Sequence, residues 1–279
     1  MPELPEVEVM RRDLEKEVVG RKIKTVEVSG SRSIRRHKQK KDFIAALEGH
    51  KIVSVARRGK YLVIRLDGPE ALVVHLGMSG QLLRAKSARE KAPKHTHVVI
   101  TFTQGGLVRF VDPRTFGEMF VAPFDDLEEQ VEELAHLGLD PLETALNWEL
   151  FGRMLADRKM RLKALLMDQK FIAGIGNIYS DEILFQAGLR WDRMSDSLSQ
   201  QEVRRLYRAI IETLQDAVKH RGSSLADEQY RDLFGQLGGY QHHHQVYDRE
   251  GESCPRCRRQ LVRARFSNRS TFFCESCQV

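Results

Sequence analysis

The four cysteines of this chain constrain its fold more than any other feature. All four lie at or beyond position 254 of a 279-residue chain, in the pattern C-x2-C-x16-C-x2-C. Because each close pair can hold one metal ion from one side, this spacing predicts a closed tetrahedral zinc site with a hairpin between the pairs. A module this short buries too little apolar surface to fold alone, so the metal supplies folding energy. The predicted ligands are Cys254, Cys257, Cys274 and Cys277.

Two alternatives use the same cysteines. Two disulfides would need an oxidising compartment, but we recognise no targeting stretch, and the chain before position 254 has no cysteine. A zinc ribbon that contacts another protein is the stronger alternative. Nearby arginines favour nucleic acid, because guanidinium groups bind phosphates well. They are Arg256, Arg258, Arg259, Arg263, Arg265 and Arg269.

The charge of the chain favours a polyanionic partner. The net charge is +6 and the pI is about 9.2, which favours such a partner without identifying it. Residues 32–41 (RSIRRHKQKK) are strongly basic and residues 125–133 (DDLEEQVEE) strongly acidic. We interpret the acidic run as a solvated linker or helix face that points away from nucleic acid. No apolar run approaches the roughly 18 residues that span a bilayer, so we expect no membrane partner.

The pattern of apolar residues divides the chain into a β-rich part and a helical part. Residues 3–19 approximate one apolar helix face. From about 21 to 122, short β-branched segments are separated by Gly, Asp and Pro turns, which predicts an antiparallel sandwich or barrel with one helix near 41–48. Residues 123–146 resemble a connector with short helical pieces. Helical periodicity then predicts helices at 148–155, 161–167, 178–187 and 200–220.

The first residues indicate nucleophilic chemistry. Processing usually removes an initiator Met before a small residue such as Pro, which would leave Pro2 as a secondary amine. A terminal amine has a pKa of about 7.7–8.0, against about 10.4 for lysine, so more of it is unprotonated at neutral pH. Such an amine can attack an aldehyde-like carbon and form a Schiff base. Glu3 would lie beside it as a general acid or base, with Glu6 one turn on. The alternative is a well-capped helix start.

Three turns in the β-rich part carry further candidates. Lys60 ends a basic turn and either reaches a phosphate or is merely exposed. Met78 lies in a glycine-rich turn and is either a core residue or a wedge between stacked bases. Arg114 and Phe116 follow a proline and are either a second wedge or a solvated Arg beside a packed Phe.

The helical part carries one candidate phosphate site. Asn177 follows a glycine-rich stretch and is a good helix N-cap, with backbone N–H groups close enough to bind a phosphate. Arg161 and Lys163 would add positive charge there. Residues 221–239 show little periodicity and are either a mobile functional loop or an irregular segment. We interpret His242, His243 and His244 as a solvated segment, because no acidic or thiol partner lies nearby at ligand spacing.

These motifs resemble those of the bacterial formamidopyrimidine-DNA glycosylases, base-excision repair enzymes that also cut at abasic sites. The resemblance covers the whole chain and includes several highly specific motifs. They are PELPEVE at 2–8, Lys60, HLGMSG at 75–80, DPRTFG at 112–117, LLMDQKFIAGIGNIYSDEILF at 165–185 and NRSTFFCESCQ at 268–278.

The resemblance implies an α+β fold that clamps DNA in a basic cleft. An N-terminal antiparallel β-sandwich carries the catalytic N-terminal helix, and a C-terminal helical domain carries a helix–two-turn–helix and a β-hairpin zinc finger. The expected parts are the catalytic domain (1–124), a linker (125–146), the helical domain with a lesion-covering loop (147–240) and the zinc finger (241–279). The implied partner is double-stranded DNA with oxidised or abasic sites. We expect a monomer in the bacterial cytoplasm, one zinc ion and no nucleotide cofactor.

The resemblance also implies residue roles in a bifunctional glycosylase and lyase. Pro2 attacks C1′ of the flipped-out nucleotide, and a Schiff base leads to β- and then δ-elimination. Glu3 donates and accepts protons at the sugar, and Glu6 is a supporting carboxylate. Phosphates near the lesion are held by Lys60, His75, Lys163, Asn177 and Arg269, of which Lys60 and Arg269 count with the catalytic set. The hole left by the base is filled by Met78, Arg114 and Phe116, and Arg114 addresses the orphaned partner, usually cytosine.

Two departures leave alternatives open. Many family members have two glycines where this chain has Ser267 and Asn268, and we expect the hairpin to survive because Asn tolerates positive φ. Residues 222–239 only loosely resemble the loop that covers the extruded base, so substrate preference stays open. The leading hypothesis is removal of oxidised purines such as 8-oxoguanine and formamidopyrimidines. The alternatives are an endonuclease VIII-like enzyme for oxidised pyrimidines, in which Leu4 is commonly Gly, and a catalytically inactive clamp.

Overall fold

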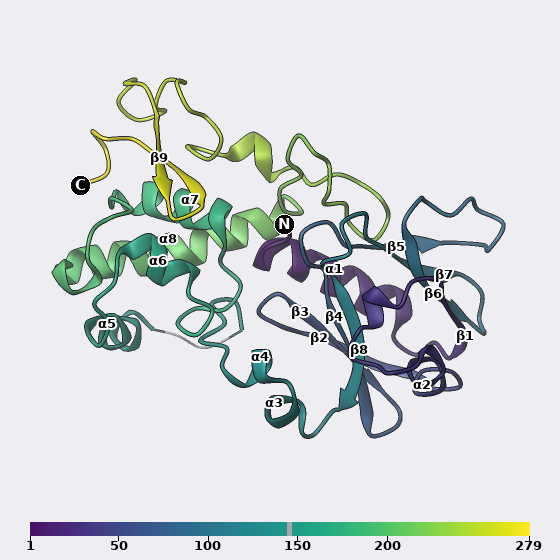
Figure 1. Cartoon of the computed structure of the whole chain (residues 1–279). Coiled ribbons are helices and arrows are strands. Elements are labelled where there is room, and N and C mark those ends of the chain that lie inside the picture. The colour runs from purple at the N-terminus through teal and green to yellow at the C-terminus, as the bar shows by residue number, and fades with distance from the viewer. Residues whose placement is uncertain (144–146) are drawn as a thin grey trace. The chain divides into compact units, whose positions relative to one another are not determined.

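The computed structural model describes residues 1–143 and 147–279, and these form two compact units (Figure 1). The first unit contains residues 1–136 and 220–241, and the second contains residues 137–219 and 242–279. Part of the predicted linker, residues 144–146, lies outside the described residues. Residues 220–241, which follow the last long helix, therefore pack with the N-terminal part of the chain.

The first unit contains two four-stranded antiparallel sheets and the N-terminal helix α1 (Leu4–Val18). The strand order is β1-β6-β7-β5 in one sheet and β2-β3-β4-β8 in the other. The predicted antiparallel sandwich is therefore confirmed, with its strands at Ile23–Val28 (β1), Ile52–Arg58 (β2), Tyr61–Leu66 (β3), Glu70–His75 (β4), Gln81–Ala85 (β5), Thr96–Phe102 (β6), Leu107–Val111 (β7) and Glu118–Pro123 (β8). Short helices lie at Arg32–Ile34 (η1), Lys40–Ala45 (α2), Leu127–Gln130 (α3) and Glu132–Ala135 (α4).

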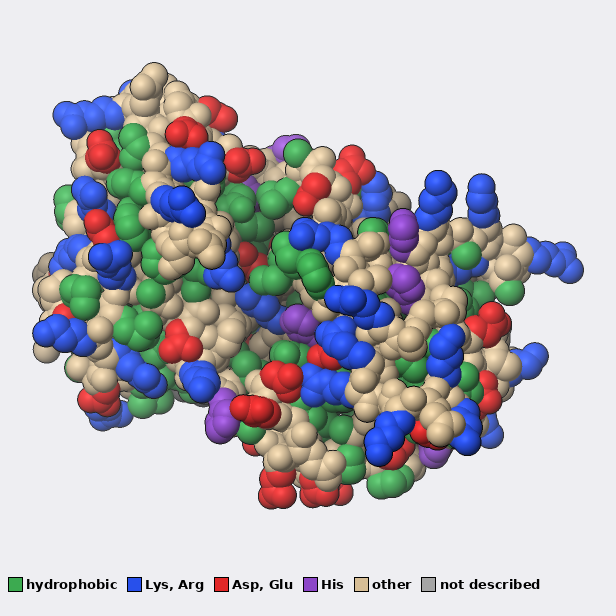
Figure 2. Space-filling model, viewed as in Figure 1, with side chains coloured by type: hydrophobic (Ala, Val, Ile, Leu, Met, Phe, Trp, Pro, Cys, Tyr) green, Lys and Arg blue, Asp and Glu red, His purple; other side chains and the backbone are tan. Residues whose placement is uncertain are grey.

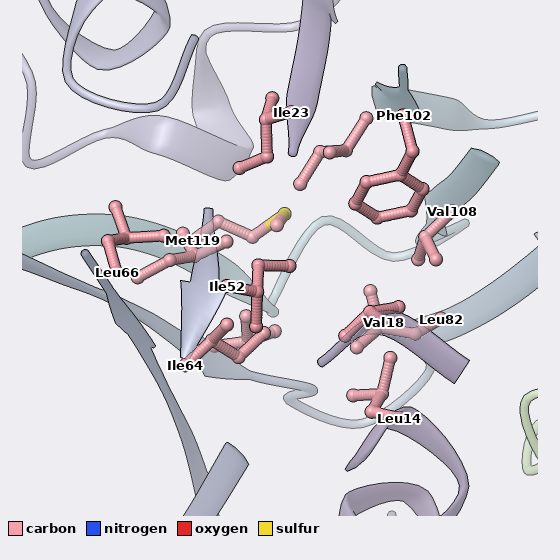
Figure 3. Close-up of a pocket in the computed structure, with 13 residues that line it drawn as sticks. Leu14, Val18, Ile23, Ile52, Ile64, Leu66, Leu82, Phe102, Val108 and Met119 are labelled. Atoms are coloured by element: carbon pink, nitrogen blue, oxygen red, sulfur yellow. The ribbon is translucent and has the colours of Figure 1, made fainter. Parts of the chain in front are cut away.

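One apolar core joins α1 to both sheets. Val7, Met10, Leu14 and Val18 of α1 belong to the same buried cluster as the strand residues. A small cavity of about 20 Å³ lies inside this core, and every side chain that lines it is apolar. Figure 3 shows these side chains as sticks. A cavity of this size has room for about one water molecule, but a water needs polar partners. The cavity is therefore a packing void, and the core fixes α1 against the strands that carry the candidate turns.

The acidic run forms an exposed helix face, as its composition predicts. Leu127 of α3, Leu134 of α4 and Val131 between the two helices are buried, whereas the acidic residues between them are exposed. Figure 2 shows Asp and Glu side chains gathered over the region where Figure 1 labels α3 and α4. The apolar residues thus anchor two short helices, and the carboxylates face solvent.

The second unit is helical and ends in a β-hairpin. Its helices are α5 (Trp148–Ala156), α6 (Leu162–Met167), α7 (Asn177–Ala187), η2 (Ser195–Ser197) and α8 (Gln200–Lys219), which confirms the four helices predicted from periodicity. η3 (Tyr240–His243) leads to the hairpin of β9 (Val262–Phe266) and β10 (Arg269–Phe273). Among the described residues, no helix is both long enough and apolar enough to cross a membrane.

Two local predictions need correction. Gly176 rather than Asn177 is the N-cap of α7, and Asn177 is the first helical residue. In the hairpin turn the positive φ of 52° falls on Ser267 and not on Asn268. The hairpin nevertheless pairs Phe266 with Arg269 across a two-residue turn. A serine tolerates this conformation less well than glycine does, so the pairing of the strands outweighs a local cost.

Candidate active site and zinc centre

The start of α1 is held by two buried glutamates. Glu3 is the N-cap and Glu6 completes a capping box, with Glu6 Oε2 accepting from Glu3 N at 2.8 Å. Glu6 Oε1 accepts from Ser223 N at 2.7 Å, so Glu6 also fixes the segment that follows α8. A Cβ at Gly222 would lie 2.6 Å from Glu6 Oε1, and only glycine permits this approach. The capped helix start that the sequence left as an alternative is therefore present.

Pro2 lies directly before this capped start. It is buried, whereas Met1 is 46% exposed. Glu3, its neighbour in the chain, is only 2% exposed. With Met1 attached, the nitrogen of Pro2 is an amide and cannot act as a nucleophile. The amine chemistry expected of Pro2 therefore depends on removal of Met1.

The segment 221–239 is packed rather than detached. Arg221 forms ion pairs with Asp13 of α1 and with Asp232. Leu233 belongs to the core of the first unit, and its carbonyl accepts from Arg84 N of β5 at 2.8 Å. The segment is therefore irregular but anchored to both α1 and β5. Sequence periodicity could not show this, because the contacts join residues far apart in the chain.

Arg57 supports the turn that carries Lys60, a role the sequence did not indicate. Its side chain is fully buried, with Nε 3.0 Å from Glu8 Oε2 and Nη1 donating to Gly59 O at 3.2 Å. The basic turn is therefore anchored by a buried arginine, and Lys60 at its end is half-buried rather than fully exposed. Burial alone would raise the pKa of Glu8, but hydrogen bonds from three arginines outweigh it and leave that pKa below its usual value.

His75 is an uncharged group at neutral pH. It ends β4, and its ring stacks on Tyr61 with the ring centroids 4.6 Å apart. Burial lowers the pKa of His75 to about 4, and Glu118 opposes this shift only in part. His75 can therefore donate one hydrogen bond to a phosphate but brings no positive charge to it.

The two turns with candidate wedge residues lie together in the first unit. Ser79 Oγ donates to the fully buried Asp112 at 2.5 Å, and the other oxygen of Asp112 accepts from Gly117 N at 2.7 Å. The two turns, anchored at this buried carboxylate, expose Met78 (37%) and Phe116 (45%). They also expose Arg114, whose guanidinium lies 5.1 Å from the Phe116 ring centroid. Met78 is therefore not a core residue, and Phe116 is not packed inside.

The predicted phosphate residues of the second unit differ in accessibility. Lys163 is fully buried, with Nζ 2.6 Å from Asp181 Oδ1. Asp181 also accepts from Thr271 Oγ1 at 2.6 Å and from Phe272 N at 2.9 Å, which ties α6 and α7 to β10. Arg269, at the start of β10, is exposed. The side-chain oxygen Oδ1 of Asn177 is buried without a hydrogen-bond partner among the described residues.

Glu182 was not recognised from the sequence. It is 2% exposed and accepts hydrogen bonds from the backbone N–H groups of Gln245, Val246 and Tyr247 at 2.8–3.0 Å. It thereby joins α7 to the segment before the finger. Two adjacent acids among the apolar residues of α7 were the available signal, because a buried carboxylate requires hydrogen-bond donors.

The four cysteines form a compact metal site. Their sulfur atoms all lie within 4.8 Å of one another, with Cys254 Sγ 3.8 Å from Cys277 Sγ and Cys257 Sγ 3.5 Å from Cys274 Sγ. A tetrahedral zinc ion with Zn–S bonds of about 2.3 Å separates its sulfurs by about 3.8 Å. The donors and distances therefore fit one structural zinc ion.

The histidine run is only partly solvated. His242 and His243 are exposed, but His244 is buried and its ring meets Tyr247 edge-on, so the solvated interpretation is wrong for His244. Across residues 1–143 and 147–279, the cysteines are the only group of three or more His, Cys, Asp or Glu placed to share a metal ion.

Comparison with known proteins identifies the family. Three family models match the chain: the formamidopyrimidine-DNA glycosylase N-terminal domain at 1–119, the formamidopyrimidine-DNA glycosylase H2TH domain at 137–229, and a zinc finger found in FPG and IleRS at 251–279. A formamidopyrimidine-DNA glycosylase from Pelotomaculum thermopropionicum is 40% identical over 278 residues, covering 100% of this chain and 99% of the relative. The chain belongs to the formamidopyrimidine-DNA glycosylase family.

Solved structures of formamidopyrimidine-DNA glycosylases share this fold. The MutM (Fpg) protein of Thermus thermophilus has a TM-score of 0.87 and 41% identity, covering 99% of this chain and 98% of that one. The Lactococcus lactis Fpg, in a complex with abasic-site DNA, has a TM-score of 0.90 and 32% identity, covering 99% of both chains. These findings confirm the predicted resemblance and the α+β fold class. The glycosylase zinc-finger match, together with the sulfur geometry, confirms one structural zinc ion.

Proposed function

We propose that this protein is a bifunctional DNA glycosylase and AP lyase that removes oxidised purines from double-stranded DNA. The observation that carries this proposal is 40% identity to a named formamidopyrimidine-DNA glycosylase over the full chain. The Lactococcus lactis Fpg structures contain DNA with an abasic site or with a Fapy-dG lesion. We propose 8-oxoguanine and formamidopyrimidines as the substrates of this chain.

The proposed chemistry starts at Pro2 after Met1 has been removed. The nitrogen of Pro2 forms a bond to C1′ of the extruded nucleotide, and the base leaves with the electrons of its glycosidic bond and takes up a proton. Opening of the sugar ring gives an iminium ion, and Glu3 exchanges protons at the sugar. Loss of a C2′ proton expels the 3′ phosphate, a second elimination expels the 5′ phosphate, and water releases the enzyme. Glu6 supports the terminus through the capping box.

DNA contacts are proposed for both units. In the first unit Lys60 and His75 bind phosphates, and Met78, Arg114 and Phe116 fill the space left by the extruded base. Their exposure on two turns that are anchored in the protein interior supports this role, because a wedge must be rigid to unstack nucleobases. Arg114 would address the orphaned cytosine. In the second unit Asn177 and Arg269 bind phosphates, and the zinc ion, held by the four cysteines, supplies folding energy for the finger.

The wider setting is also proposed. A clamp around one lesion needs no two-fold symmetry, so we propose a monomer that works on the nucleoid in the bacterial cytoplasm, without a nucleotide cofactor. The working parts would be the catalytic domain 1–124, the linker 125–146, the helical domain 147–240 and the finger 241–279.

Covalent trapping on a panel of damaged DNAs tests the function. With borohydride present, we expect the matured protein to form an adduct with abasic-site DNA, because reduction fixes the Schiff base. We also expect it to act faster on 8-oxoguanine opposite cytosine than on thymine glycol. The measurement is the shifted protein–DNA band and the rate of base release. Faster release of thymine glycol would support the endonuclease VIII-like alternative, and the absence of any adduct would indicate an inactive clamp.

Lys163 is proposed to act by support rather than by direct phosphate contact, because its side chain is buried against Asp181. Lys163→Met would leave Asp181 buried without its cation, so we expect the free energy of unfolding to fall by about 3–5 kcal/mol. The slope of log K against log salt for DNA binding should stay unchanged. If Lys163 contacted a phosphate directly, its substitution would reduce the magnitude of that slope by about 0.9. Lys159→Met, at a lysine whose side chain is 81% exposed, is the matched control.

A further inference from the structure

The exposed wedge turn at 112–117 is held from outside by two arginines of the basic run. Arg32 Nε donates to Thr115 O at 3.3 Å, and Arg35 donates to Gly117 O at 2.9 Å and to Phe116 O at 3.4 Å. Three successive carbonyls of the turn are therefore bonded to η1 and to the residue that follows it. The basic run 32–41 thus has a role in the first unit that its composition alone does not indicate.

The conformation of this turn needs such support. Thr115 has a φ of 56°, in the left-handed region that a β-branched residue rarely adopts. Asp112 fixes the inner side through Arg114 N at 3.2 Å and Gly117 N at 2.7 Å. The arginines fix the carbonyls on the outer side. A strained backbone persists only where its surroundings determine it from several directions, and here the strained residue lies between Arg114 and Phe116.

The side chain of Arg35 is 42% exposed, yet its guanidinium is bonded to the protein on several sides. Its guanidinium also lies 3.0 Å from the buried carboxylate of Glu118, which offsets its charge. A planar guanidinium can meet two carbonyls and a carboxylate together, which a lysine ammonium does less well. These bonds occupy donors that a phosphate contact would need, so the geometry favours support of the turn.

We propose that Arg35 is a positioning residue for Arg114 and Phe116. It holds the turn in the shape that enters the duplex, and it thereby controls extrusion of the damaged base and the choice of partner base. This inference rests on the proposed function, because it assigns a step of the same reaction. It does not extend to the elimination steps, since an abasic site has no base to extrude.

Arg35→Gln and Arg36→Gln form a matched pair for the test. Both arginines pair with Glu118. Arg36 also bonds the carboxylate of Glu133, and of these two arginines only Arg35 bonds carbonyls of the turn. Base extrusion is monitored in stopped-flow experiments through the fluorescence of a 2-aminopurine placed next to 8-oxoguanine. We expect Arg35→Gln to slow the fluorescence rise and the excision rate about tenfold, a barrier change of about 1.4 kcal/mol. The preference for cytosine over adenine opposite the lesion should fall with it.

The remaining readouts separate positioning from other roles. Arg36→Gln should extrude bases like the unmodified protein, and Arg35→Gln should keep its trapping yield on abasic DNA and its salt slope. Equal extrusion rates for the two variants would overturn the inference. The inference would also be overturned if Arg35→Gln extruded bases normally but reduced the magnitude of the salt slope by about 0.9, because that reduction marks the loss of a phosphate contact. If Arg35→Gln does not fold, Arg35→Lys replaces it, with an intermediate rate expected and a normal rate counting against the inference. Failure of the unmodified protein to trap abasic DNA would instead defeat the proposed function.

Discussion

Pro2→Gly is expected to reduce covalent trapping and strand cutting by at least about 100-fold while DNA affinity stays within about twofold. Glycine still permits removal of Met1, so an amine remains, but it is a primary amine without the ring that orients it. A secondary amine gives an iminium ion that cannot lose its charge by deprotonation. A primary amine gives a protonated imine, which can lose its proton and become neutral. A misplacement of about 1 Å at a reacting centre can cost about 100-fold in rate.

Pro5→Ala is the matched control for this change. Pro5 is a nearby proline in the first turn of α1, and its nitrogen is never the terminus. The measurements are the yield of borohydride-trapped adduct and the affinity for abasic DNA, with intact mass to verify loss of Met1. Protein that retains Met1 should be inactive as well, because its Pro2 nitrogen is an amide. Strand cutting by Pro2→Gly at the unmodified rate would remove Pro2 from its proposed role.

Removal of zinc is expected to unfold the finger, to weaken DNA binding about 100-fold, and to leave the β-rich unit folded. Apparent binding free energies of structural zinc reach about 10–16 kcal/mol, so the short module does not fold without the ion. Arg269 lies on β10 between the two cysteine pairs and would lose its fixed position. The first unit has its own core, which extends from α1 across both sheets, and none of that core depends on the metal.

Tryptophan emission reports this loss directly. Trp191 meets Phe266 and Phe273 of the hairpin, with ring centroids 5.8 and 6.4 Å away. Trp148→Phe leaves Trp191 as the only tryptophan of the chain, because the chain has two. Chelation should then change the emission in step with zinc release, while the β-sheet signal in circular dichroism persists. Unchanged DNA affinity after proven metal loss would contradict a DNA-binding role for the finger.

Local chemistry was sufficient to predict several features. Cys254 and its three partners follow a spacing that few sites other than zinc use, and the helices follow an apolar period that packing requires. The motifs from PELPEVE at 2–8 to NRSTFFCESCQ at 268–278 also sufficed for the family, since they occur in one order along the whole chain. Exposure of Met78 and Phe116 was left open, because an apolar residue in a turn is equally compatible with burial.

The sequence by itself determined the zinc ligands, the division into β-rich and helical parts, and the family. Only the tertiary structure decided which charged residues are buried, namely Arg57 with Glu8 and Lys163 with Asp181, and that Arg35 bonds the carbonyls of the wedge turn. Each of these contacts joins residues from separate elements, and a charged residue has the same local pattern whether its partner is water or a buried carboxylate. Whether a charged residue is buried depends on which distant element packs against it, so its burial can be seen only in the packed structure.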